Sequence, residues 1–381
     1  MNEEFDFPDN DIDEKNDDIE LETGNDNIEI KEPFDPNSIN IKIIPFTVGQ
    51  LIDKIEYEEI RVPEYQRKAG LWDLKKKSRF IESLILRLPI PLFYFDEREL
   101  NLWWVVDGLQ RVTTIREFVV EKKFKLKYLE FLKDLDDCDW TQLERNYQRN
   151  INQSQITINL IQKGTPEKVK HNIFRRINQG GIELSPQELR TALLWGHRTT
   201  LLKQMVSNKT EAGTAFLKAT DYKVKTDRQE DLDFASRFVA FFLLGFEKYE
   251  PDMDNFLTDG TLQIPEDENS QNDIIEAFKS SMEMSFAIFN DDSFRKRTNK
   301  DDLRKPINKP LFEALSVGFA RLDKHKKDKL LSNKEAFKSD LIQKQKNDEA
   351  FWRSLSTGTA TRDSVKKRNE VILELLIKHT I

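Results

Sequence analysis

The stretch WWVVDGLQRVTTIREFVV, residues 103–120, predicts a strand that turns directly into a helix. The β-branched and aromatic residues at 103–106 favour an extended strand, and from Val112 the apolar residues recur at helical spacing. Between them lies a corner, residues 107–111, that contains an acid, a glycine, a glutamine and an arginine. A glycine allows a tight turn and the close approach of a ligand, and the free N–H groups at a helix start favour an anion. This corner is therefore the first candidate for an anion-binding site.

The apolar pattern around the corner predicts a small mixed sheet with helices. A polar turn joins two strand-like runs at 91–97 and 102–108, and residues 156–162 form another strand-like run. The apolar residues within 74–88 recur on one face of a helix, and Pro89 follows as a helix stop, so this stretch is predicted to be helical. The other predictions are a short strand at 41–46, a helix at 48–55 and a polar, loop-rich stretch at 134–155.

The rest of the chain has a mostly helical pattern, so the predicted fold class is α+β. Residues 185–196 carry the signals of a capped helix, with Ser185 as N-cap, Pro186 first, Glu188 three residues after the cap and Gly196 beyond the end. The apolar run at 238–246 is too short to cross a membrane and predicts a buried helix. The predicted domains are a disordered acidic tail at 1–38, a sheet domain at 39–200 and a mainly helical domain at 201–381.

The negative charge is concentrated at the N-terminus. Residues 1–40 hold fifteen acids and two lysines, a net of −13, which leaves +5 for the rest of a chain whose total is −8. The acidic segment is interpreted either as a solubilising leader or as a nucleic-acid mimic that shields a basic body. Basic stretches at 295–309 and 323–331 make DNA a reasonable partner. One cysteine, Cys138, and the lack of a signal peptide suit the cytoplasm, with no membrane partner.

Three polar clusters suggest converging contacts to phosphate, because the arginine fork grips oxyanions with two hydrogen bonds. The first cluster is Gln66 and Arg67 in VPEYQRKAGLW, and the second is the corner itself. The third lies in FRRINQGGIELSPQELR, and its members are Arg175, Arg176, Asn178 and Arg190. Each cluster is weak by itself, since surface arginines commonly form ion pairs of little energetic value.

These motifs, in this order, resemble the N-terminal domain family of GmrSD-type modification-dependent restriction endonucleases. The similar segments lie within roughly 41–195 and read VPEYQR, LW, RFIESLILRLPIPLFYF, VVDGLQR and FRRINQGGIELSPQELRTAL. The resemblance implies a ParB/sulfiredoxin-like fold, a place in phage defence, and nucleotide binding and hydrolysis at the corner. The family usually has Asp-Gly-Gln-Gln-Arg there, whereas this chain has Leu109 in the place of the first glutamine. The exchange leaves phosphate binding plausible and removes a polar side chain that could position water.

Phosphoryl transfer depends on positioning and charge neutralisation more than on a covalent catalyst. Asp107 would hold Mg²⁺ or orient water, Arg111 would contact phosphate, and Arg67 would add a second positive charge. The predicted catalytic set is Asp107, Gln110 and Arg111, and the predicted nucleotide-binding set is Gln66, Arg67, Gly108, Arg176 and Asn178. The chain has no Walker-type glycine-rich lysine motif, which argues against a P-loop NTPase.

The sequence does not predict that this chain is itself a nuclease. Its four histidines, at 171, 197, 325 and 379, are scattered singly rather than paired with acidic or asparagine ligands. Asp107 with Glu121 and Lys123 matches the spacing of another nuclease class, but Glu121 is expected near the end of a helix, about 20 Å from Asp107. Two functions stay open: a nucleotide-hydrolysing sensor that works with a partner nuclease, or a non-catalytic DNA-binding adaptor. The oligomeric state is not predicted.

Overall fold

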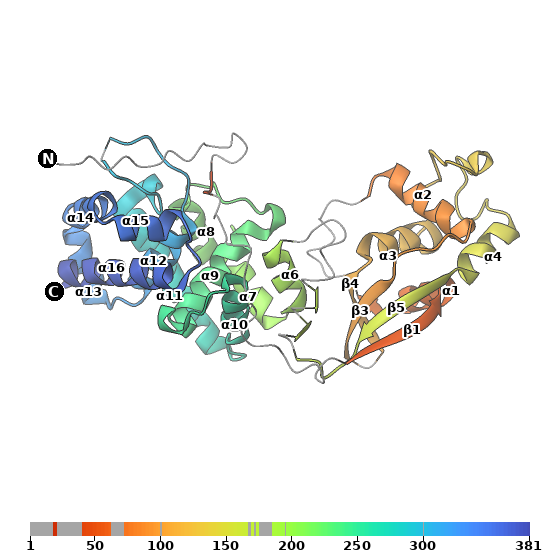
Figure 1. Ribbon diagram of the computed structural model, residues 1–381, viewed down its shortest axis with the longest axis horizontal. Coiled ribbons are helices and arrows are strands. Elements are labelled where there is room, and N and C mark those ends of the chain that lie inside the picture. Colours follow the sequence, from red (N-terminus) through yellow and green to blue (C-terminus); the bar gives the residue numbers. More distant parts are fainter. Residues whose placement is uncertain are drawn as a thin grey trace. The chain divides into compact units, whose positions relative to one another are not determined.

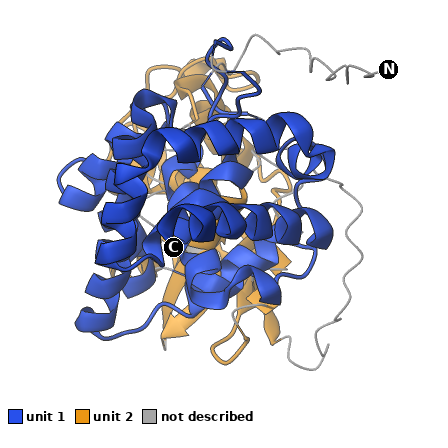
Figure 2. Cartoon of the chain, turned by 90° about the vertical axis from the view of Figure 1, so that its left-hand side faces the viewer, with its two compact units in different colours: residues 1–30, 194–381 blue, residues 31–193 orange. Residues whose placement is uncertain are grey.

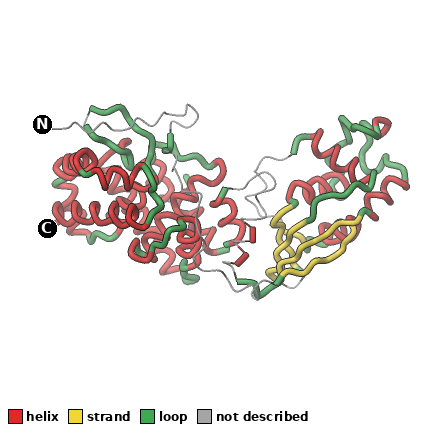
Figure 3. Tube along the Cα trace, in the orientation of Figure 1, coloured by secondary structure: helices red, strands yellow, loops and turns green. Residues whose placement is uncertain are grey.

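The computed structural model describes residues 18–20, 40–61, 72–99, 101–166, 169–170, 173–174, 185–194, 196–299 and 301–381. The chain divides into two compact units, one of residues 31–193 and one of residues 1–30 with 194–381, coloured separately in Figure 2. Each unit has its own hydrophobic core. The described strands of the sheet all lie in the unit 31–193, as Figure 3 shows.

The unit 31–193 is built on a five-stranded mixed sheet in the order β1-β5-β3-β4-β2 (Figure 1). β1 pairs with β5 and β3 pairs with β4 in antiparallel fashion, while β5 with β3 and β4 with β2 are parallel. The strands are β1 Ile41–Thr47, β2 Ile60–Arg61, β3 Phe93–Glu99, β4 Leu102–Asp107 and β5 Gln155–Ile161. This arrangement confirms the predicted α+β class and the predicted strands.

Helices share one hydrophobic core with the inner face of this sheet. Phe93 and Phe95 on β3 and Trp103 and Val105 on β4 alternate inward, and all four are buried. α2 and α3 lie on the same side of the sheet in Figure 1. The helices are α1 Val48–Glu56, α2 Leu74–Ile85, α3 Leu109–Ile115 with a π-helical turn at Arg116–Val120, and α4 Arg145–Gln153.

α4 corrects the prediction of loops at 134–155. Its sequence, RNYQRNINQ, contains one fully buried apolar residue, Ile151, so no apolar stripe is visible in the sequence. The helix forms because Ile151 packs into the core and Ser154, just after it, donates a hydrogen bond to the carbonyl oxygen of Leu84 at 2.8 Å. Tertiary contacts, rather than local pattern, therefore decide this element.

The unit that contains 194–381 is mainly helical, as predicted. Residues 238–244 of the apolar run at 238–246 lie in α9, and Phe238 and Phe241 are buried. α9 ends at Leu244 because Gly245 takes a positive φ of 80°. The main helices are α7 His197–Val206, α8 Glu211–Ala219, α9 Glu230–Leu244, α10 Met253–Leu262, α11 Glu268–Phe289, α12 Lys309–Ala320, α13 Lys324–Ser332, α14 Lys334–Asn347, α15 Glu349–Ser356 and α16 Arg362–Thr380.

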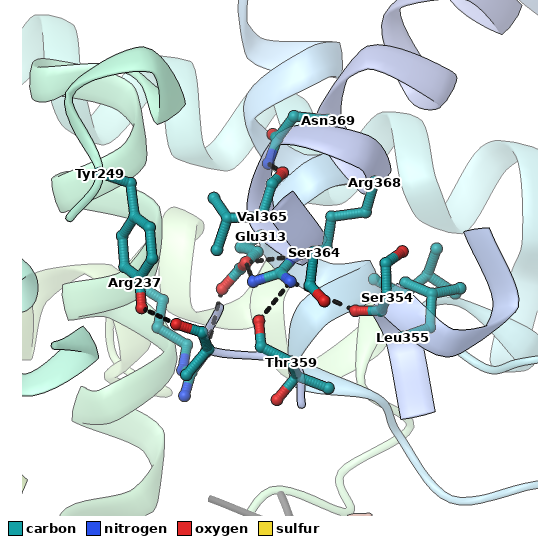
Figure 4. Close-up of polar contacts among 12 residues, drawn as sticks. Arg237, Tyr249, Glu313, Ser354, Leu355, Thr359, Ser364, Val365, Arg368 and Asn369 are labelled. Atoms are coloured by element: carbon teal, nitrogen blue, oxygen red, sulfur yellow. Dashed lines mark hydrogen bonds and ion pairs between the residues drawn. The ribbon is translucent and has the colours of Figure 1, made fainter. Parts of the chain in front are cut away.

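A buried ion network joins three of these helices (Figure 4). Glu313 on α12 accepts a hydrogen bond from Arg237 on α9 at 2.9 Å and another from Nε of Arg368 on α16 at 2.7 Å. Arg368 also donates to the carbonyl oxygen of Thr359 at 2.5 Å. Glu313 and Arg368 are 0 % exposed, so each charge depends on its partners. The network fastens the loop between α15 and α16 to the helical core.

Residues 18–20 belong to the segment predicted to be disordered, yet they pack on the helical unit. Ile19 forms a parallel bridge with Ile307 and is 4 % exposed. The other residues of the predicted tail at 1–38 lie outside the described residues. Within the described parts of the chain, every helix is too short or too polar to span a bilayer.

Candidate functional site at the β4–α3 corner

The predicted corner is a sharp turn at Gly108, between the end of β4 and the start of α3. Gly108 is buried and has a φ of +97°, a conformation that residues other than glycine rarely adopt. A Cβ atom there would lie 2.5 Å from the ring of Phe93 and 3.2 Å from Nη2 of Arg111. The glycine is therefore required both by backbone conformation and by the close packing of Phe93 and Arg111.

Arg111 lies under this turn rather than in open solvent. It is 8 % exposed, and its guanidinium carbon lies 4.4 Å from the centre of the Phe93 ring. Nη1 donates to the carbonyl oxygens of Pro91 and Leu92, the second at 3.2 Å. Burial lowers the pKa of Arg111, while the negative charge of Asp107 opposes that shift. These contacts give Arg111 a structural role, and its direct contact with phosphate stays a prediction.

Asp107 is the acidic side chain that the corner presents to solvent. Its Oδ2 accepts a hydrogen bond from Nη2 of Arg111 at 2.9 Å, and its side chain is 48 % exposed. Oδ1 has no hydrogen-bond partner among the described residues. One carboxylate oxygen is thus held in a fixed direction by a buried arginine, and the other is open to a ligand.

Gln110 and Leu109 face different surroundings in the first turn of α3. The Oε1 atom of Gln110 accepts a hydrogen bond from the backbone N–H of Trp72 at 2.9 Å. Leu109 is partly buried and packs against the core of the sheet unit. The leucine at the family's glutamine position therefore adds apolar packing.

Trp72, the last residue of the first motif, contacts this corner. Arg61 on β2 pairs with Trp104 on β4, and Trp72 bonds to Gln110. The predicted residues Gln66 and Arg67 lie between these two points, outside the described residues.

The third motif is described only from Ser185 onward. Ser185 and Glu188 form the predicted reciprocal cap, with N–H to oxygen distances of 2.7 and 3.1 Å, at the start of α6 Pro186–Leu193. Arg190 on this helix is 1 % exposed and donates to Gln187, so it is a buried residue rather than a surface one. The predicted residues Arg175, Arg176 and Asn178 lie outside the described residues.

The comparison with protein families agrees with this arrangement of motifs. Residues 48–195 match the family model described as the GmrSD restriction endonuclease, N-terminal domain. This segment is a GmrSD N-terminal domain. No curated protein and no solved structure shows significant similarity to the chain. The matched segment covers most of the unit 31–193, including the whole β4–α3 corner.

The GmrSD N-terminal domain also holds a buried acid that the sequence analysis missed. Asp96 on β3 is 0 % exposed, and its carboxylate lies 2.9 Å from Nζ of Lys170 and 2.8 Å from Nε of Arg98. It lies on the sheet face opposite to Phe95, because neighbouring strand residues point to opposite faces. The signal in the sequence was a charged residue inside the strand-like run FYFDE.

The described residues contain no ready-made metal cluster. No group of three or more His, Cys, Asp or Glu side chains among them is placed to bind one ion. His197 contacts the carbonyl oxygen of Ile264 at 3.3 Å, and His379 contacts Asp340 at 2.7 Å. Glu121 follows the π-helical turn, as predicted, rather than lying on a strand beside Asp107. Among the described residues, Asp107 therefore has no second His, Cys, Asp or Glu side chain placed with it to complete a metal site.

Proposed function

We propose that this chain is a nucleotide-binding component of a restriction or phage-defence system, with a Mg²⁺-bound nucleoside triphosphate at the β4–α3 corner. The observation that carries the proposal is Asp107, a half-exposed carboxylate fixed by the buried Arg111 at the start of α3. The family to which the domain belongs supplies the restriction context. Its proposed setting is the cytoplasm, with DNA as a partner and cleavage by a partner nuclease.

The electrostatics of the corner favour a metal-bound nucleotide over a bare one. The first N–H groups of α3 have no carbonyl partner within the helix and favour phosphate oxygens. Asp107 would repel the same oxygens unless a cation lay between them. Mg²⁺ suits this arrangement, since it commonly binds one or two carboxylates together with substrate phosphates and water. Mg²⁺ would supply charge neutralisation and orientation of the phosphates when bound.

The chain's own residues would then have distinct tasks. Asp107 would bind the ion through Oδ1, Arg111 would hold Asp107 in place, and Gly108 would let the phosphates approach the backbone. Gln110 would position the chain at Trp72, and this bond brings the end of the first motif to the corner. Gln66, Arg67, Arg176 and Asn178 remain proposed phosphate or base contacts on the strength of their motifs.

Calorimetry with the four nucleoside triphosphates tests the proposal. The wild-type chain is expected to bind at least one of them with Mg²⁺ and to lose that binding in EDTA. Asp107→Asn should weaken Mg²⁺-dependent binding by about tenfold or more, equivalent to about 1.4 kcal/mol. Asp53→Asn, at an exposed acid on α1, is the matched control and should bind as wild type does. Absence of binding heat for all four triphosphates would reject the nucleotide site.

Leu109 favours the second candidate, a non-catalytic DNA-binding or adaptor module. Its contact with the core suits a domain that keeps the fold without positioning water. Phosphate release by wild type and by Leu109→Gln distinguishes the two candidates, with melting temperatures measured alongside because a part-buried amide can lack partners. Release by either protein supports a hydrolase. If wild type and Leu109→Gln are both folded and release no phosphate, the adaptor function replaces the hydrolase function.

A further inference from the structure

Asp18, Ile19 and Glu20 form a short acidic segment on the helical unit, which is joined to Ile307 by an isolated β-bridge. The N–H of Ile307 donates to the carbonyl oxygen of Asp18 at 3.0 Å, and the N–H of Glu20 donates to that of Ile307 at 2.9 Å. Ile19 and Ile307 are both buried. Ile19 anchors the segment, and the acids on either side of it, Asp18 and Glu20, form ion pairs with Lys223 and Lys296.

The carboxylate of Glu20 is bound by two buried donors, Lys296 and Asn308. Its Oε1 is 2.5 Å from Nζ of Lys296, and its Oε2 accepts from Nδ2 of Asn308 at 2.9 Å. Nζ of Lys296 also donates to Oγ of Ser356 at 2.7 Å. Lys296 is 6 % exposed and Asn308 is 2 % exposed, so both donors are held inside the unit. A buried ammonium of this kind is costly without an anion beside it.

Further lysines extend the positive charge beyond this pocket. Asp18 lies 3.1 Å from Nζ of Lys223 and 4.0 Å from Nζ of Lys225. Nζ of Lys305 lies 5.2 Å from the centre of the Trp352 ring, and Nζ of Lys296 lies 4.9 Å from the same centre. Lys305 forms no ion pair with any described residue, so four lysines face two carboxylates.

Two of the neighbouring arginines, Arg297 and Arg304, are paired with acids, whereas Arg295 donates to the backbone carbonyl oxygens of Asp291 and Lys305. Arg297 is paired with Asp292, and Arg304 is paired with Asp221 and Asp291. We define the lysine pocket as Lys223, Lys225, Lys296 and Lys305, with Asn308 and Ser356 as neutral donors.

We propose that the lysine pocket binds the phosphodiester backbone of nucleic acid, and that Asp18 and Glu20 occupy it in place of two phosphates. Asp18 and Glu20 are two residues apart, so in extended backbone their Cα atoms are about 6 to 7 Å apart. That separation resembles the step between consecutive phosphates of one strand. Lysine ammonium groups with amide and hydroxyl donors are the groups that contact phosphates in nucleic-acid complexes. The proposal is independent of the nucleotide site in the other unit.

The double variant Asp18→Asn/Glu20→Gln of the full chain tests whether the two acids compete with nucleic acid for the lysine pocket. Both changes keep side-chain shape and the backbone bridge to Ile307 while they remove the two charges. Glu266→Gln/Glu268→Gln, at two exposed acids of the same unit, removes equal charge elsewhere and serves as control. Fluorescence anisotropy with labelled duplex DNA and duplex RNA, across a salt series, gives affinity and salt dependence together.

The double variant should bind nucleic acid about tenfold more tightly than wild type at low salt. Its plot of log affinity against log salt should be steeper by about 1.8, because each additional phosphate that the protein neutralises on B-DNA adds about 0.9 to the slope. The control should leave this slope unchanged. Separate measurements with DNA and RNA show which nucleic acid binds. Tighter binding of either one by the double variant supports the proposal that the lysine pocket binds phosphodiesters.

Lys305→Gln, added to the double variant, tests whether the binding uses this pocket. Lys305 forms no ion pair among the described residues, so the fold should tolerate the change, and melting temperatures check this. The slope should fall by about 0.9. The proposal is overturned if the double variant and wild type have equal affinity and slope, if Lys305→Gln has no effect, or if inorganic phosphate binds and nucleic acid does not.

Discussion

Arg111 connects the backbone of one strand end to the carboxylate of another. Its planar fork reaches the carbonyl oxygens of Pro91 and Leu92 before β3 and the side chain of Asp107 at the end of β4. Such a fork makes several hydrogen bonds in fixed directions, whereas a lysine offers a single charged point. At this scale the arginine stabilises the corner and fixes the direction of the acid.

Arg111→Lys is expected to lower the free energy of unfolding by about 2 to 4 kcal/mol, since it keeps the charge but loses the hydrogen bonds of the fork to the carbonyl oxygens of Pro91 and Leu92. Denaturant unfolding measures the change. Arg79→Lys, at an exposed arginine whose Nη1 lies 3.7 Å from Glu130, is the matched control and should change stability by less than about 0.5 kcal/mol. Equal losses in both variants would show that the fork at Arg111 has no special role.

At the scale of elements, Glu82 on α2 holds the loop that follows the π-helical turn. Its carboxylate accepts hydrogen bonds from the backbone N–H groups of Glu130, Phe131 and Leu132, at 2.7 to 3.1 Å. Burial raises the pKa of Glu82, but the hydrogen bonds from these three residues outweigh it and lower the pKa below its usual value. The charged form is therefore part of the folded structure.

Glu82→Gln should destabilise the sheet unit by about 2 to 4 kcal/mol at neutral pH, because an amide has one acceptor oxygen for three donors. A depressed pKa means that Glu82 stabilises the fold above its unfolded pKa, and that this stability is lost as pH falls through the folded value. The variant should lose less stability than wild type between about pH 5 and pH 3. Parallel acid profiles for the two proteins would contradict this account of Glu82.

Local sequence patterns predicted the elements whose formation depends on residues close by in the sequence. The strands β3 and β4, the turn at Gly108 and the Ser185–Glu188 cap follow from alternation, glycine chemistry and capping rules. α4 and the inward position of Arg111 did not follow, since both depend on partners more than 15 residues away. For the candidate site, sequence reasoning located the corner but not the direction in which its arginine points.

At the scale of the whole molecule, the two units have separate hydrophobic cores and separate buried acids. Glu82 lies in the sheet unit, and Glu313 lies in the helical unit between Arg237 and Arg368. Removing one partner of a buried charge network leaves the other charges uncompensated, which is much more costly than losing a surface pair. The two units should therefore respond independently to changes at their own buried acids.

Glu313→Gln is expected to destabilise the helical unit by about 3 to 5 kcal/mol. Calorimetric unfolding should resolve two transitions, of which Glu313→Gln lowers one and Glu82→Gln lowers the other. One transition that both variants lower equally would mean that the units unfold as a single body.

The nucleotide site at the β4–α3 corner is tested most directly by hydrogen exchange of the full-length chain with Mg²⁺ and the triphosphate that binds. Peptides that cover residues 107–112 should exchange more slowly in the wild type with nucleotide than without it, because phosphate oxygens would accept from the first N–H groups of α3. Asp107→Asn should lose this protection. Unchanged exchange at 107–112, at nucleotide concentrations that saturate the protein, would contradict the account.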